Sequence, residues 1–164
     1  MDYLIKLAFA LLLFILTWLS QEQHQEWAVE RNLLKSANNF AAHDAVQLVH
    51  QESVAEGRLL IDDEAAYETF IADLCANLGL DGSLQPLPGS RLRQEVKVVW
   101  FEVIDERTVT FPYFYQHPTY RIAKYLRGPA VIAVIETSHP VLIRGFLEQP
   151  PIRVPAIQEF AFIS

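Results

Sequence analysis

The sequence predicts an α+β fold, in which a long protruding amino-terminal helix packs on a small antiparallel sheet domain with one additional short helix. Three observations support this prediction. Residues 1–56 contain neither Gly nor Pro, so nothing in that stretch interrupts a helix. The first twenty residues are almost entirely apolar. From Val96 onward the apolar residues form short runs bounded by Gly, Pro and Asp, which is typical of strands.

The composition limits the function before any motif is considered. The chain has 164 residues, which is enough for about one domain, and its 51% apolar residues exclude a disordered tail. The 13 basic and 20 acidic side chains give a net charge of -7, and no basic stripe for a nucleic acid is present. The single cysteine excludes an intramolecular disulfide framework and a Cys-based metal cluster. We expect no metal, no cofactor and no nucleic-acid partner.

Residues 1–20 are predicted to form a hydrophobic anchor, the first half of the long helix. The run at 7–19 is apolar except for Thr17. A run of about 13 to 17 residues is short for a membrane span and also fits a secretory signal peptide. No small-residue cleavage site follows it, so we expect the segment to be retained. Lys6 precedes the run and glutamates follow it, which favours a cytoplasmic amino terminus before assembly.

Residues 21–50 are predicted to continue the same helix with one apolar face. The face has a seven-residue repeat with flanking apolar positions: Trp27, Leu34, Ala41 and Leu48, beside Leu33, Ala37, Phe40 and Ala45. The opposite face is expected to meet solvent through Glu30, Arg31, Lys35, Asn38, His43 and Gln47. A helix over residues 3–50 would be roughly 70 Å long, which exceeds any domain that this chain could build. We therefore expect its first half to protrude and its second half to lie on the globular part.

Residues 51–164 are predicted to form the globular α+β domain. A short strand is expected at 58–61, followed by a helix that Asp62 caps and Gly79 ends. Residues 80–93 form a loop in this prediction. The expected strands belong to one antiparallel sheet of four to six strands. The segment at 119–126 could be a strand or a short helix. The strands are expected at 96–104, 108–115, 130–137, 141–147 and 156–163.

No catalytic group is expected, and we predict that the protein is not an enzyme. His43 and His50 lie two helical turns apart, about 10 Å by helix rise, which is too far for one metal ion. Cys75 falls on the apolar side of the predicted helix, as expected for a buried and inert thiol. Eight aromatic side chains between residues 100 and 125 are expected to be core, with a sugar or surface contact as the alternative.

Two stretches give the chain a resemblance to a known family. The apolar run LAFALLLFILTWL is followed by the alanine-rich stretch SANNFAAHDAVQLV and then by a small sheet domain. This arrangement resembles the type IV pilin superfamily, including the TadE-like pseudopilins. Those subunits are cut by a prepilin peptidase and carry Glu at the fifth position. Here the fifth residue is Ile5 and the cleavage motif is absent, so the resemblance implies a subunit used without processing. Asp2 is the nearest acidic substitute, and it could also pair with Lys6 one turn away.

The resemblance implies a structural subunit of an extracellular filament. Such a subunit rests in the membrane, meets a pilus-type export and assembly machinery, and then forms a helical homopolymer. Two alternatives remain open: a single-span envelope protein that never polymerises, such as a minor pseudopilin or an assembly component, and an enzyme or ligand-binding domain on a membrane anchor. In the filament interpretation, apolar side chains of the first half-helix pack between subunits: Leu4, Leu7, Phe9, Leu11, Leu12, Phe14, Ile15, Leu16, Trp18 and Leu19.

Overall fold

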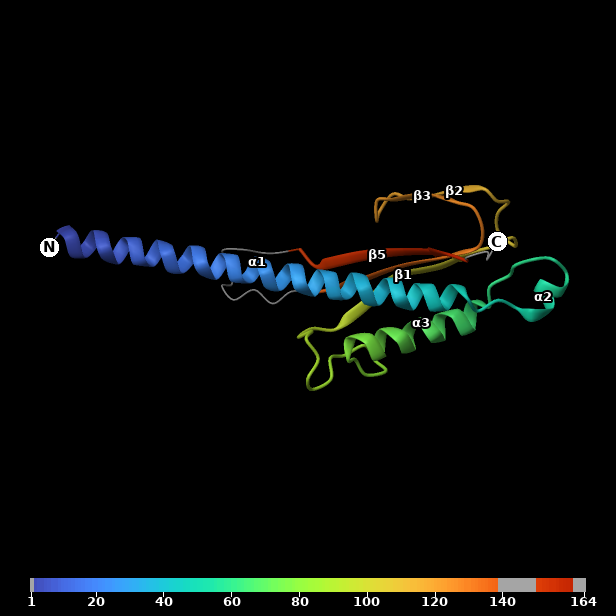
Figure 1. Cartoon of the computed structure of the whole chain (residues 1–164), viewed down its shortest axis with the longest axis horizontal. Coiled ribbons are helices and arrows are strands. Elements are labelled where there is room, and N and C mark those ends of the chain that lie inside the picture. Colours follow the sequence, from blue (N-terminus) through green and yellow to red (C-terminus); the bar gives the residue numbers. More distant parts are fainter. Residues whose placement is uncertain (1, 139–149, 161–164) are drawn as a thin grey trace.

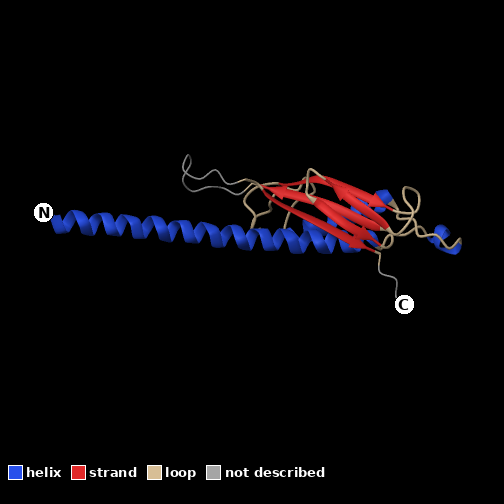
Figure 2. Cartoon of the chain, turned by 90° about the horizontal axis from the view of Figure 1, so that it is seen from above, coloured by secondary structure: helices blue, strands red, loops and turns tan. Residues whose placement is uncertain are grey.

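The structure is a computed structural model that describes residues 2–138 and 150–160, and it confirms the α+β fold (Figure 1). Helix α1 (Asp2–Val46) runs along most of the molecule, and its first half projects beyond everything else in both views (Figures 1 and 2). Its second half lies on the folded part. The other elements are α2 (Gln51–Ala55), α3 (Asp63–Leu78), β1 (Val96–Ile104), β2 (Tyr113–His117), β3 (Ile122–Leu126), β4 (Ala130–Thr137) and β5 (Ile152–Glu159).

Helix α1 ends four residues before the predicted His50, although no Gly or Pro stops it. The chain leaves the helix because residues 48–50 pair with residues 60–62. His50 N donates to Leu60 O at 2.9 Å, and Asp62 N donates to Leu48 O at 2.8 Å. The predicted strand at 58–61 is therefore wrong, because the structure has a single antiparallel bridge there, between Val49 and Ile61.

Helix α3 begins and ends where its capping residues predict. The Asp62 side chain accepts a hydrogen bond from Ala65 N at 3.1 Å, which satisfies one free amide of the first turn. Gly79 ends the helix in the left-handed conformation, with φ of 65°. A side chain is strained in that conformation, so glycine is the favoured residue at this position.

Among the residues that the structure describes, the strands form two sheets, so the prediction of one sheet with four to six strands is wrong. One sheet has the order β1-β4-β5 and the other is the β2–β3 hairpin, and every pairing is antiparallel. Strand β2 begins at Tyr113 rather than at residue 108, because the preceding Pro112 has no amide hydrogen for the ladder. The ambiguous 119–126 segment contains β3, and β5 begins before the predicted residue 156. The predicted strand at 141–147 lies outside the described residues.

Strand β4 lies in the middle of the head because both of its faces are covered. Val131, Ala133 and Ile135 face a core shared with α1 and α3, whereas Ile132 and Val134 face a second core under the β2–β3 hairpin. All five side chains are fully buried. This position explains the unbroken apolar run in the sequence of β4, since a strand that alternates with polar residues could not face two cores.

An ion pair between the buried Asp105 and the exposed Arg107 joins the β1–β2 turn to the start of α3. Asp105 is 1% exposed and accepts hydrogen bonds from Arg107 N at 2.9 Å and from Ile61 N at 3.1 Å. The Arg107 guanidinium lies 2.6 Å from the same carboxylate and donates to Ile61 O at 2.8 Å. Burial raises the pKa of Asp105, but hydrogen bonds from Arg107 and Ile61 outweigh it and hold that pKa below its usual range.

Candidate functional site

The most unusual surface of the molecule is the first half of α1, residues 2–19, which we call the stalk. Every stalk side chain is exposed, and the described residues that follow α1 form the head. The ten side chains predicted to pack between subunits are 37% to 72% exposed, with Leu19 lowest and Leu4 highest. Soluble monomers rarely expose a contiguous apolar surface of this size. The structure therefore leaves the stalk without any cover from its own head.

Past its first turn, which holds Tyr3, the stalk is built so that its backbone and the Thr17 hydroxyl need no water. Its amides and carbonyls bond within the helix, and Thr17 Oγ1 donates to Leu13 O at 2.8 Å. By length and composition, α1 is long and apolar enough to cross a membrane. At 1.5 Å per residue, the stalk is about 27 Å long, close to the roughly 30 Å of a bilayer hydrocarbon core.

The only ions of the stalk are Asp2 and Lys6, near its free end. Within residues 2–138 and 150–160 the structure forms no ion pair between them. The Lys6 ammonium instead lies 6.0 Å from the centroid of the Tyr3 ring. The role of the two charges in packing between chains stays a prediction.

The second half of α1 attaches the stalk to the head through small buried side chains. Leu34, Ala37, Ala41 and Ala45 of the predicted apolar face are buried. Three alanines permit a close approach of α1 to α3 and to the β1-β4-β5 sheet. Trp27 is half-buried against the same core. Leu48 is also half-buried but lies beyond the end of the helix, so its placement on the helical face is wrong.

For two residues of α1, Asn38 and Phe40, the prediction of which side faces the head and which faces solvent is wrong. Asn38 was expected in solvent but is fully buried. Its Nδ2 donates to Val154 O on β5 at 2.9 Å and to Ala133 O on β4 at 3.4 Å. Phe40 was expected beside the buried face but is 61% exposed. The amide is buried because two adjacent strands offer it carbonyl oxygens, and the helical turn then directs Phe40 outward.

The residues considered for chemistry are not brought together. His43 and His50 are both exposed, and His50 Nδ1 lies 3.8 Å from Asp62 Oδ2. No three His, Cys, Asp or Glu side chains of the described residues are placed to hold a metal ion. Cys75 is half-buried rather than fully buried, with its Sγ 3.0 Å from Asp81 O. Burial raises the pKa of this thiol, which makes it a weak nucleophile at neutral pH.

The aromatic side chains are divided between two cores and the surface. Phe101 contacts Tyr67 and Phe70 on the helix side of the sheet, with ring centroids 5.1 Å apart in each pair. Tyr115 is buried on the other side, and its hydroxyl donates to Glu102 Oε2 at 2.6 Å. Phe114 and Tyr125 are 48% and 60% exposed, so the expectation of a wholly buried set is wrong for this pair.

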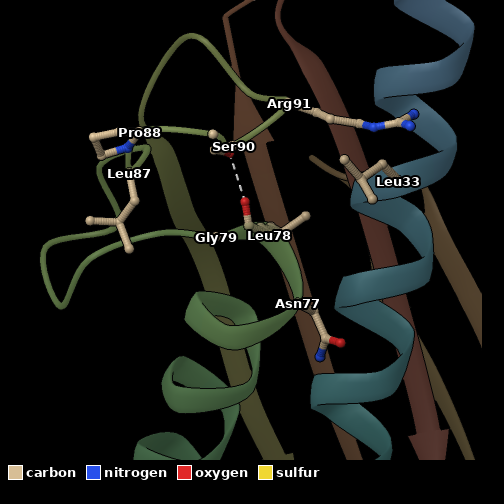
Figure 3. A pocket seen from close by; sticks show the side chains of 9 residues that line it. Leu33, Asn77, Leu78, Gly79, Leu87, Pro88, Ser90 and Arg91 are labelled. Atoms are coloured by element: carbon tan, nitrogen blue, oxygen red, sulfur yellow. Dashed lines mark hydrogen bonds between the residues drawn. The ribbon is translucent and has the colours of Figure 1, made fainter.

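A cavity of about 460 Å³ opens between α1, the end of α3 and the loop that follows it (Figure 3). Its wall includes Leu33, Leu78 and Leu87, and Ser90 Oγ donates to Leu78 O at 2.7 Å. Arg91 is the single charged side chain among the residues that line it. An apolar hollow with one guanidinium provides neither an acid–base pair nor a nucleophile.

Comparisons with protein-family models, with curated proteins and with solved structures found no match to this chain. The features of the molecule that bear on its function are therefore the stalk and its junction with the head.

Proposed function

We propose that this protein is a structural subunit of a pilin-like filament, which polymerises through its stalk. The single observation that supports the proposal is that every side chain of residues 2–19 is exposed on a continuous helix anchored in a folded head. Such a surface is covered by lipid or by stalks of other copies. Burial of a large apolar side chain contributes roughly 1.5–3 kcal/mol, so stalks that have left the bilayer gain by bundling.

The shape of the molecule favours an open polymer over a closed pair. A stalk that packs against the α1 helix of another copy is a head-to-tail contact, because the two copies use different surfaces. Contacts of this kind repeat along an axis unless a rotation closes them into a ring. In such a polymer the stalks form the centre, the heads form the outer layer, and each α1 is a rigid connection between the two.

A second function is favoured by the length of the stalk alone. About 27 Å of apolar helix nearly matches the hydrocarbon thickness of a bilayer, so the chain also suits a single-span envelope protein that never polymerises. The two functions differ in where the mature chain resides. A filament subunit leaves the membrane and is recovered in long polymers, whereas a single-span protein stays in the membrane as a monomer or small complex.

The experiment compares a stalk variant with a matched head variant in cells that make this protein. Leu12 on the stalk is 53% exposed and Leu87 on the head is 48% exposed. Surface material is sheared, pelleted and examined by negative-stain microscopy, and the membrane fraction is probed for the chain. We expect filaments from wild type and Leu87→Asp and none from Leu12→Asp, whose carboxylate would be buried unpaired between stalks.

Circular dichroism and thermal unfolding of both purified variants in detergent check that the head is folded. Filaments from Leu12→Asp would contradict the proposal, because the stalks could not then form the centre. Wild-type chain found only in membranes, as monomers or small complexes, would also contradict it and would select the single-span protein.

A further inference from the structure

The second half of α1 has an apolar surface at the edge of its contact with the head, where Leu33 packs against the core and lines the cavity near the end of α3. Val29 and Phe40 lie on it and are 51% and 61% exposed, and Leu33 between them is half-buried. The three positions are separated by four and seven residues, which places them on one side of the helix. Leu34 and Ala41, which hold α1 on the head, are fully buried on a different side. We call Val29, Leu33 and Phe40 the back patch.

Acidic side chains precede the back patch on the same side of α1. Glu22 and Glu26 are exposed, and spacings of four and three residues align them with Val29. The stalk has the complementary order of charge and apolar surface. Lys6 is its one basic residue, directly before the apolar run at 7–19. Among the described residues no carboxylate forms an ion pair with Lys6.

We propose that the back patch is the docking site for the stalk of a second copy of this chain, with Lys6 of that copy beside Glu26. This inference rests on the proposed function and adds the register of the contact. Lys6 is level with Glu26 when the copies are shifted by 20 residues, or about 30 Å along the helix axis. The apolar run at 7–19 then lies alongside residues 27–39, which include Val29 and Leu33, and Phe40 follows directly after them.

The charge of Lys6 favours a register beside Glu22, Glu26 or Glu30, and of these only the shift of about 20 residues sets the apolar run between Val29 and Phe40. In a bilayer, a lysine this close to the end of the helix extends its ammonium to the headgroups. Once the stalk is enclosed by other helices, an ammonium without a carboxylate is strongly unfavourable. A shift of only about 11 residues would put Lys6 against the apolar side chains around Thr17 of its neighbour. The shift of about 20 residues gives the ammonium an anion and covers the apolar patch at the same time.

A charge exchange tests the pairing of Lys6 with Glu26. Lys6→Glu places two carboxylates side by side and is expected to lower the amount of pelleted filament by roughly tenfold or more. The double variant Lys6→Glu with Glu26→Lys restores the pair in reversed order and is expected to restore filaments. Lys35→Glu is the matched control, because it makes the same exchange at an exposed position of α1 outside the proposed contact.

A second pair of variants tests the back patch against matched exposed residues of the head. Val29→Asp and Phe40→Asp are expected to lose filaments, whereas Val54→Asp and Phe114→Asp keep them. Val54 and Phe114 are both 48% exposed, so the controls carry the same substitutions at similar exposure.

Cysteine cross-linking measures the register without relying on a loss of assembly. In a Cys75→Ala background, positions 6 and 26 of one helix are about 30 Å apart, far beyond the reach of a disulfide. A disulfide between them therefore joins two chains. Oxidised filaments of the double variant, in which each chain carries both Lys6→Cys and Glu26→Cys, are expected to give a ladder of covalent multimers on a denaturing gel. Each single variant has one cysteine per chain and can form nothing larger than a dimer.

The outcomes separate this inference from the proposed function. If wild type makes filaments that Leu12→Asp abolishes, but the charge exchange fails to restore assembly and no ladder forms, the docking site is wrong. The stalks then assemble in another register. If wild type makes no filaments at all, the proposed function fails and the inference fails with it.

Discussion

Asn38 provides the sharpest test of how the stalk is fixed to the head. Its side chain is fully buried, and its amide donates to Val154 O at 2.9 Å and to Ala133 O at 3.4 Å. Asn38→Ala removes both hydrogen bonds and leaves the two carbonyls facing a small apolar gap. One intramolecular hydrogen bond contributes about 1 kcal/mol net, and an unsatisfied buried group costs about 1–3 kcal/mol. The Asn38 Oδ1 atom is buried without a hydrogen-bond partner among the described residues, so its removal offsets part of this loss. We expect Asn38→Ala to lower the free energy of unfolding by about 1–2 kcal/mol.

The assay is urea unfolding of the full chain in detergent, with tryptophan fluorescence as the signal that reports the fraction unfolded. Asn32→Ala on the exposed side of α1 is the matched control and is expected to change stability by less than about 0.5 kcal/mol. Asn38→Asp keeps the shape but cannot donate from its carboxylate, so it is expected to destabilise more than Asn38→Ala. Wild-type stability in Asn38→Ala would refute the conclusion that this amide holds α1 on the sheet.

Three further predictions concern the head. Val134→Asp puts an unpaired charge in the core under the β2–β3 hairpin, so we expect urea titration to show a loss of about 4 kcal/mol or more in the free energy of unfolding; a variant as stable as wild type would refute the burial of Val134. Because hydrogen bonds hold the pKa of Asp105 below its unfolded value, its contribution is complete above roughly pH 4 and is lost as the pH falls through the folded pKa. Asp105→Asn should therefore flatten the acid limb of the stability curve, and an unchanged limb would contradict this assignment. Burial and the hydrogen bond to Glu102 raise the pKa of Tyr115, so in an alkaline absorbance titration this phenol should ionise only when the head unfolds, and Tyr115→Phe should remove that late step.

The parts of the fold that the sequence predicted correctly are those set by local chemistry. The absence of breakers before residue 56 predicts one long helix, Asp62 and Gly79 mark the ends of α3, and the apolar run of β4 indicates a buried strand. Each of these signals lies within a few residues of the element that it specifies. The exposure of the stalk was predictable for the same reason, since a helix of that length exceeds the head on which it lies.

The incorrect predictions concern features that depend on distant residues. Asn38 is buried because carbonyls 95 and 116 residues further along the chain accept its hydrogen bonds. Helix α1 ends at Val46 because the following residues pair with residues 60–62. Neither partner can be identified from the helix sequence itself. The exposure of Phe40 follows from the burial of Asn38, so the back patch became visible only in the structure.

A helical reconstruction of sheared filaments by electron cryomicroscopy would show whether the stalks form the filament core. We predict parallel helices along the filament axis, enclosed by the heads, with contacting copies shifted by about 30 Å. Density in which residues 2–19 lie on the outside of the filament, or in which the heads alone make the contacts, would contradict it.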